Sequence, residues 1–544
     1  MNLLRVPLSI DARVFGVCFL VLLPLFLAPL FVTEILPGLD LPFHLALADM
    51  LGKRGSPTSP YAAFYDGGLR FAPYAAHYLM LVALGKVMNL LAAHKLIVAL
   101  YVAAMPLSTA SLLAACRRSR IPALLAFPLA YNLTLHYGFI SFALSLPALM
   151  FLLAQVVKHL ASQPGRVRRS WLWAAAAGVF LFLCHLQNFL FGVAAVLAFA
   201  LLVSVPWRRR LLGASTLVPA LAALAYRQFA ASAAGGPAKP TLAFTWALVK
   251  RHRLGDLGGR TFLRDFLERL SVIPVHAMRA FADQADVRAC NQLLWAIVLY
   301  FIAGLVAWVV LRKVTPSRPR LRVWPAILVV FAGALAAYLL LPHHLNELSL
   351  TTFFPRFAVL IPLMAIALVP AGLAKVRGWL RLVIPLPAVI MCALYGYQLI
   401  THYRAFGKET ADFVEVLHKT PPGGKAVGMV FSRASRVMRV ESIFLGLVDY
   451  YPATRSAPGS MAPLPYCGMH DIPCTAKPAG AILPNPWQPM DVSVGKTPPV
   501  FDYFFVRSPP PNVNPFGPYL GSVEVLARSG TWTVYRKKTG SPPR

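Results

Sequence analysis

Acidic residues are scarce in this chain. Its 544 residues include 20 aspartates and glutamates against 52 lysines and arginines, which gives a formal net charge of +32. Charged residues make up 13% of the sequence and hydrophobic residues 58%. A water-soluble protein of this length could not bury so much apolar surface, so lipid must be part of its solvent. The basic residues stand in clusters between apolar runs, which indicates membrane topology and not nucleic-acid binding.

Several motifs of enzyme and transport chemistry are also missing. The sequence contains no Walker loop, no G-x-G-x-x-G after a strand, no C-x-x-C, no H-E-x-x-H and no G-x-S-x-G. Nucleotide-driven transport and hydrolase chemistry therefore have no support. Charges in the middle of the apolar runs are scarce as well, which disfavours an ion-coupled carrier, because such carriers need ionisable groups at membrane depth.

The apolar runs predict an all-α polytopic membrane protein with about eleven transmembrane helices. The runs cover about residues 14–36, 95–115, 121–135, 138–157, 171–187, 189–206, 211–231, 292–311, 322–341, 357–374 and 379–400. A basic cluster follows every second run. The first cluster begins at Arg117, after the second run, and the last ends at Arg381, after the tenth run. All of them fall on one side if the N-terminus is cytoplasmic, as expected for a multi-pass protein of the plasma membrane.

This threading divides the chain into two domains. Residues 1–402 form the transmembrane domain, with long outer loops at about 37–94 and 232–291. The apolar segment 74–91 lies in the first of these loops; counting it as a span would invert the later clusters, so we expect an interfacial or re-entrant helix. Residues 403–544 follow an odd number of spans and are expected outside the cytoplasm.

The C-terminal part is rich in proline and glycine and predicts a small α+β domain. Its strand-like patches lie at 426–431, 501–506 and 531–535. In an oxidising compartment, Cys467 and Cys474 could form a disulfide that closes a short loop and contributes roughly 2 to 3 kcal/mol. The alternative is two free thiols.

Polar residues gather at the outer ends of the predicted spans. Asp40 stands just past the first span, and His44 follows one turn later. This spacing favours a catalytic base, or a metal site for Mg or Mn, with the histidine in support. The alternative is a helix cap beside an interfacial histidine.

Other polar residues occupy the outer ends of different spans and are candidates for substrate binding. They are His136, His185, Asn188, His343, His344 and Glu347. Their restriction to one face suggests a shared site, whereas each histidine taken singly is more often an interfacial anchor.

Arg356 begins the tenth apolar run from the outside, where the positive-inside rule disfavours arginine. A guanidinium held there is a candidate for binding a phosphate, because it can donate to two oxygens at once. The basic stretch from Lys250 to Arg269 could likewise help hold an anionic lipid-linked substrate, or merely bind anionic lipid. The alternative for Arg356 is snorkelling to lipid headgroups.

The segments Asp40 to His44, Tyr131 to Phe139 and Pro355 to Phe357 resemble stretches of uncharacterised bacterial membrane proteins of the GT-C superfamily. The layout of residues 1–400 resembles that superfamily too. The resemblance implies a membrane glycosyltransferase of the cell envelope that moves a sugar from a polyprenyl-phosphate donor to an extracytoplasmic acceptor. By this resemblance, Asp40 is expected to act as the catalytic base or as a metal partner. Many members have a second acid nearby, whereas this chain has Pro42, Phe43 and His44 there.

The sequence supports two candidate functions from different classes of protein. One is the glycosyltransferase, with a polyprenyl-phosphate sugar lipid and membrane lipids as its partners and no nucleic acid. The other is a non-catalytic lipid or polysaccharide carrier, or an assembly protein of the membrane. A carrier requires a polar cavity through the spans, whereas the enzyme requires a one-sided outer cavity beside Asp40.

Overall fold

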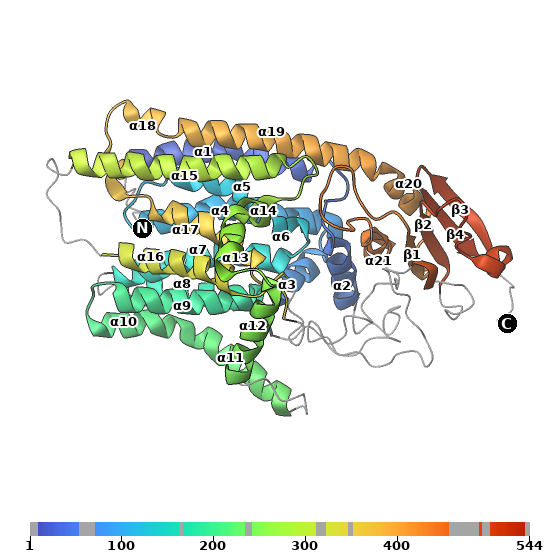
Figure 1. Cartoon of the computed structure of the whole chain (residues 1–544), viewed down its shortest axis with the longest axis horizontal. Helices are drawn as coiled ribbons and strands as arrows, with labels where there is room; N and C mark the ends of the chain where they lie inside the picture. Colours follow the sequence, from blue (N-terminus) through green and yellow to red (C-terminus); the bar gives the residue numbers. More distant parts are fainter. Residues whose placement is uncertain are drawn as a thin grey trace.

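The computed structural model is a helical bundle with a small sheet beyond one end (Figure 1). It describes residues 9–53, 71–162, 167–233, 242–311, 322–345, 352–455, 489–491 and 501–538. The long helices run along the longest axis of the molecule. The N-terminal helix begins at the end of the bundle far from the sheet.

Six described helices are long and apolar enough to cross a membrane. They are Ile10–Leu30 (α1 and η1), α4 (Leu90–Ala115), α7 (Ile140–Leu160), α8 (Val167–Cys184), α15 (Ala285–Val310) and Leu380–Glu409 (α18 and α19). Each overlaps an apolar run of the sequence, so the membrane class is confirmed. The expected count of eleven spans is not.

The remaining apolar runs form shorter or interrupted helices. They are Ile121–His136 (η2, α5 and α6), α9 (Leu186–Leu202), α11 (Val218–Ala233), α16 (Trp324–Leu340) and Pro355–Leu368 (η7 and α17). The run that begins at Ile121 is divided among η2, α5 and α6, and Pro128 in α5 lacks the backbone N–H that would continue the hydrogen-bond ladder from η2. Hydropathy alone does not register such breaks.

Short helices cover the sheet-side end of the bundle or connect its elements. They are α2 (Leu41–Lys53), α3 (Ala75–Leu84), α10 (Trp207–Ala214), α12 (Leu242–Leu257), α13 (Phe262–Ser271), α14 (Ile273–Met278), α20 (Ala411–Lys419) and α21 (Tyr450–Arg455). The segment expected to be interfacial or re-entrant contains α3, and the second long loop contains α12, α13 and α14.

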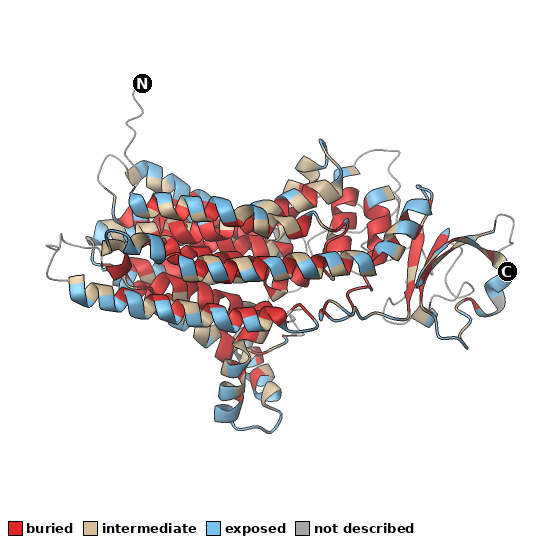
Figure 2. Cartoon of the chain, turned by 90° about the horizontal axis from the view of Figure 1, so that it is seen from above, coloured by how far each residue is buried: buried red, intermediate tan, exposed pale blue. Residues whose placement is uncertain are grey.

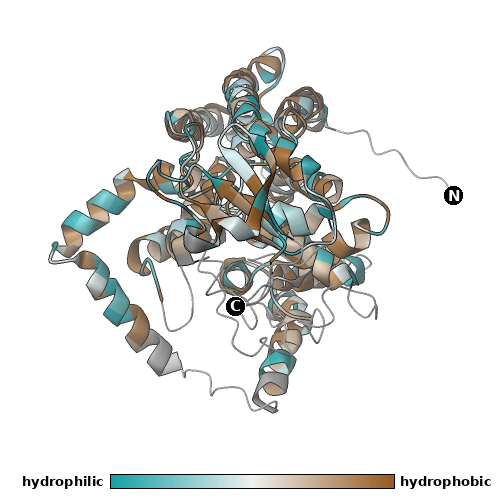
Figure 3. Ribbon diagram, turned by 90° about the vertical axis from the view of Figure 1, so that its right-hand side faces the viewer, coloured by the Kyte–Doolittle hydropathy of each residue, from teal (hydrophilic) through white to brown (hydrophobic). Residues whose placement is uncertain are grey.

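Helix α7 forms the centre of the bundle. In its most apolar window 89% of the residues are buried, against 28% for α15, whose Trp295 and Val310 are exposed. Buried residues fill the middle of the bundle while exposed ones follow its rim (Figure 2). Figure 3, viewed from the sheet side, shows hydrophobic residues on the outer helices as well. A rim that is apolar outward is what lipid-facing helices require.

The C-terminal sheet has the strand order β1-β2-β4-β3. Strands β1 (Ala426–Val430) and β2 (Tyr503–Arg507) are parallel, and β4 (Trp532–Lys537) is antiparallel to β2 and to β3 (Val523–Ser529). Three strands coincide with the predicted patches, so the helical bundle with a small C-terminal sheet is confirmed. The predicted boundary at 402 falls inside α19 (Leu386–Glu409), which continues directly toward α20.

Glycine permits one close helix contact in the bundle. A Cβ atom on Gly372 in η8 (Ala371–Lys375) would lie 2.1 Å from the carbonyl oxygen of Gly304 and 2.3 Å from the backbone nitrogen of Trp308 in α15. Only a residue without a Cβ atom lets these backbones approach so closely.

We therefore expect Gly372→Ala to lower the free energy of unfolding by roughly 1 to 3 kcal/mol, because η8 and α15 must move apart. Gly16→Ala is the matched control: no described heavy atom lies within 4 Å of its added Cβ, and alanine favours the helix. Thermal unfolding in detergent measures both variants. Equal midpoints for the two would contradict the packing argument.

Candidate functional site

Asp40 is held at the sheet-side end of the bundle by a turn from another part of the chain. Its backbone N–H donates to the carbonyl of Tyr137 at 3.0 Å, and its own carbonyl accepts from the N–H of His44 at 3.1 Å as α2 begins. Gly138 lies against this turn with φ +89, and an added Cβ would stand 2.8 Å from the nitrogen of Asp40. The position of the carboxylate therefore depends on glycine at 138.

The environment of Asp40 raises the pKa of its carboxyl. Burial disfavours the charged form and lifts the pKa to about 6, while the positive charge of Arg356 opposes this rise. An acid with this pKa is largely ionised at neutral pH and still binds a proton readily. That is the property a general base needs.

Arg356 lies in η7 (Pro355–Val359) among aromatic and imidazole rings. Its Nη1 is 3.2 Å from Nε2 of His185, and its guanidinium carbon lies 4.4 Å from the ring centroid of Phe139. Tyr74 meets the His185 ring edge-on at 4.9 Å. The structure thus brings together Asp40, His185 and Arg356, three of the residues singled out from the sequence.

The other predicted residues have different surroundings. His136 is fully buried between the carbonyl of Asn132, 3.0 Å from Nδ1, and the hydroxyl of Tyr403, 3.2 Å from Nε2. Asn188 is also buried, and its Nδ2 donates to Oγ of Ser145 at 2.5 Å. These contacts give both side chains a place in the packing between helices.

His44 and the histidine pair after α16 also have close polar neighbours. Nδ1 of His44 is 2.7 Å from the hydroxyl of Tyr78. Nδ1 of His343 lies 2.6 Å from Nε2 of His344, which is exposed. Glu347, Cys467 and Cys474 lie outside the described residues.

The basic stretch in the second outer loop is partly neutralised within the protein. Arg253 and Arg269 are both buried, and each forms an ion pair with Asp265. Arg269 lies 3.2 Å from Asp265 and 3.3 Å from Asp256. Asp256 accepts from the backbone N–H of His343 at 2.7 Å. These ion pairs join α12 to α13, and Arg253 and Arg269 also donate to backbone carbonyls at the end of α16, so both arginines have a structural role.

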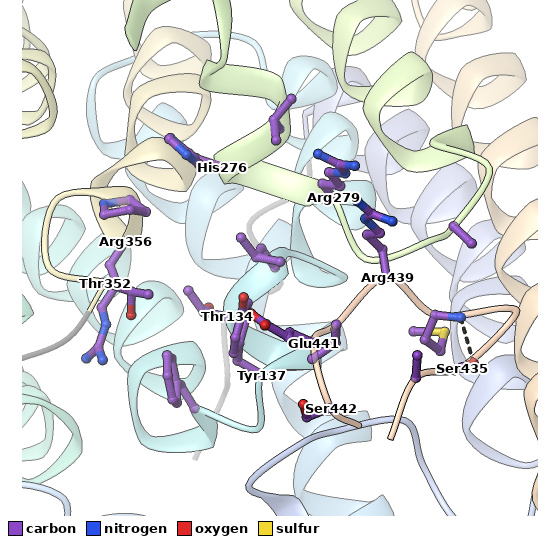
Figure 4. Close-up of a pocket in the computed structure, with 18 of the residues that line it drawn as sticks. Thr134, Tyr137, His276, Arg279, Thr352, Arg356, Ser435, Arg439, Glu441 and Ser442 are labelled. Atoms are coloured by element: carbon purple, nitrogen blue, oxygen red, sulfur yellow. Dashed lines mark hydrogen bonds between the residues drawn. The ribbon is translucent and has the colours of Figure 1, made fainter. Parts of the chain in front are cut away.

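A pocket of about 660 Å³ lies between the end of the bundle and the segment after β1. It is lined by four arginines, Arg279, Arg356, Arg433 and Arg439, and by one acid, Glu441. Figure 4 shows Arg279 and Arg439 next to each other on one side, Arg356 on the other, and Glu441 between them near Thr134 and Tyr137. Such a lining favours an anionic ligand.

Backbone pairing brings Arg279 and Arg439 together. The N–H of Arg439 donates to the carbonyl of Ala280 at 2.6 Å, and the N–H of Ala282 donates to the carbonyl of Val437 at 2.9 Å. Within the described part of the chain, neither arginine forms an ion pair with a carboxylate. The sequence pattern did not single them out, because they are 160 positions apart and neither stands at the end of an apolar run.

The described residues do not form a metal site. No group of three or more histidine, cysteine, aspartate or glutamate side chains among them is arranged to hold a metal ion. Asp40 and His44 are one turn apart, but the imidazole of His44 is directed to Tyr78. We therefore derive no chemical step that passes through a metal.

Comparison with solved structures finds several that are similar to this chain. The chain is similar to the crystal structure of ArnT from Cupriavidus metallidurans in the apo state, with 14% identity, coverage of 96% of this chain and 97% of that one, and a TM-score of 0.39. No family model matches the sequence, and no curated protein does. A similarity of this size does not define a family, so the function below is argued from the geometry of the site.

The raised pKa of Asp40 predicts a pH-dependent difference in stability between the native protein and Asp40→Asn. The pKa of Asp40 is about 6 in the folded protein and about 3.9 in an unfolded chain. The stability of the native protein relative to the variant is therefore greatest below pH 4 and is lost as the pH rises through 6. Above pH 7 the variant should be more stable by roughly 1 to 3 kcal/mol, and below pH 4 the two should be equal. Thermal unfolding in detergent from pH 4 to 8 measures this. Parallel curves would show that burial does not perturb Asp40.

Proposed function

We propose that the protein is a membrane glycosyltransferase that moves a sugar from a polyprenyl-phosphate donor to an acceptor hydroxyl outside the cytoplasm. The observation that carries the proposal is the position of Asp40, a carboxyl with a pKa of about 6 that lies within the electrostatic reach of Arg356. Arg356 in turn lines the cationic pocket. In this proposal the N-terminus is cytoplasmic, and the pocket and the C-terminal domain lie on the outer side of the inner membrane.

The two side chains supply complementary parts of the reaction. The carboxylate of Asp40 takes the proton of the acceptor hydroxyl as the acceptor oxygen attacks the anomeric carbon of the sugar. The bond between that carbon and the phosphate oxygen breaks, and its electron pair leaves with the polyprenyl phosphate. Arg356 stabilises the negative charge of the leaving phosphate. A single displacement of this kind inverts the configuration at the anomeric carbon.

Neighbouring residues support these roles. The rings of Phe139 and His185 both contact the guanidinium of Arg356, at 4.4 Å from the Phe139 centroid and 3.2 Å from Nε2 of His185. Arg279 and Arg439 add positive potential at the far side of the pocket. A volume of about 660 Å³ is in the range of pockets that enclose small ligands.

The position of the pocket favours the enzyme over the carrier. Its charged lining belongs to the sheet-side end of the bundle, and the central helix α7 is buried over most of its length and has its charged residue, Lys158, in the last turn at the opposite end. A carrier moves its polar cargo through the middle of the membrane and needs polar groups at that depth.

The proposal predicts that transfer of labelled sugar from a polyprenyl-phosphate-sugar pool in proteoliposomes depends on Asp40 and Arg356. We expect Asp40→Asn to lower kcat/KM about 100-fold or more, because the proton loses its acceptor. Arg356→Gln should lower it by about 100-fold, because the leaving phosphate loses its cation. The control is Glu34→Gln, which removes an exposed acid from the same connection. Unchanged transfer in Asp40→Asn would refute the assignment of the base.

The pH dependence of the same reaction tests the base independently. Only ionised Asp40 accepts a proton, so kcat/KM of the native protein should rise between pH 5 and 7 and reach half its plateau near pH 6. The residual rate of Asp40→Asn should lack this rise. A native profile that is flat across this range would assign the base to another group.

A further inference from the structure

The end of the bundle opposite the pocket contains a larger groove of about 1540 Å³. It lies between the last turns of α4, the last turn of α7 and the first turns of α8. It is close to the start of α1, because Asp11 accepts from the hydroxyl of Ser119 and from the N–H of Arg120 at 2.6 and 2.9 Å. The groove is therefore far from Asp40 and has no part in the proposed reaction.

Four cationic side chains and no acid line the groove: Arg117, Arg120, Lys158 and Arg169. Lys158 crosses from α7 to donate to Oγ of Ser111 on α4 at 3.1 Å, and it lies close enough to Arg120 for the two charges to repel. Among the described residues none of the four forms an ion pair with a carboxylate. Like charges held together in this way favour an anionic occupant.

Apolar side chains also line the groove, together with the polar Ser111, Gln155, Ser162 and Ser170. Ala110 and Ala114 on α4 leave space between the helices, and Leu107 and Trp173 are 46% and 52% exposed beside it. A solvent-filled groove would leave this surface in contact with water. A molecule that joins an anionic head to hydrocarbon chains satisfies both the cations and the apolar side chains.

We propose that this groove binds a phospholipid whose headgroup carries two phosphates, with the phosphates between the four cations and acyl chains along α4. Four cations without a neighbouring acid exceed what the single charge of a one-phosphate lipid neutralises, whereas two phosphodiesters match them more closely. Basic pockets between membrane helices are suited to such headgroups. The proposal is independent of the glycosyltransferase function.

The test is native mass spectrometry of the detergent-purified full chain titrated with cardiolipin, phosphatidylglycerol or phosphatidylethanolamine. We expect cardiolipin to bind about tenfold or more tightly than phosphatidylglycerol, and phosphatidylethanolamine to bind more weakly still. The double variant Arg117→Gln/Arg169→Gln removes two exposed cations and should lose about tenfold or more of the cardiolipin affinity.

The matched control is Arg168→Gln/Arg208→Gln, which removes two exposed cations from the same end of the bundle but outside the groove. It should keep the native affinity. An equal loss in both double variants would show that cardiolipin responds only to the overall charge, and equal binding of cardiolipin and phosphatidylglycerol would refute the two-phosphate headgroup. Because binding is measured without a sugar donor, either result is independent of catalytic activity.

Discussion

The contact between Gly138 and the backbone of Asp40 is the constraint on which the site depends. The turn after α6 (Leu133–His136) meets the turn before α2 so closely that an added Cβ would lie 2.7 to 2.8 Å from two backbone nitrogens. The N–H groups of Leu39 and Asp40 donate to the carbonyls of His136 and Tyr137 at 3.2 and 3.0 Å. An acid placed by backbone contacts of this kind keeps its position while it loses and regains a proton, because neither hydrogen bond involves the carboxylate.

The electrostatics of the site follow from that placement. Burial disfavours the charged form of the Asp40 carboxyl and raises its pKa. Arg356 counters the burial, and the resulting pKa of about 6 leaves the group ionised but reactive. Arg356 is itself kept between Phe139 and His185, so its charge is available to a ligand without being fully exposed to water. Catalysis by charge is most effective in such a partly dry setting.

The sequence predicts the class of fold well and the number of spans poorly, for a physical reason. Lipid solvation requires long apolar runs, so α4, α7 and α15 stand out by composition. Whether a run forms one continuous helix depends on local backbone geometry: the run after α4 is divided into three short elements, whereas α4 and α7 continue through Pro106 and Pro147. Strand β3, with sequence VEVLARS, escaped notice because only part of one face is buried.

The residues of the site also differ in how far the sequence predicts them. Asp40 and Arg356 could be found from the sequence because each is a charge at the edge of an apolar run, where a cost in free energy must be offset by some function. Arg279 and Arg439 could not, since each is an ordinary exposed or half-exposed arginine until the pairing of residues 280–282 with 437–439 brings them together. That pairing joins the second outer loop to the segment after β1. The cationic pocket is therefore a property of the assembled chain, and the C-terminal part contributes to it directly through Arg433, Arg439 and Glu441.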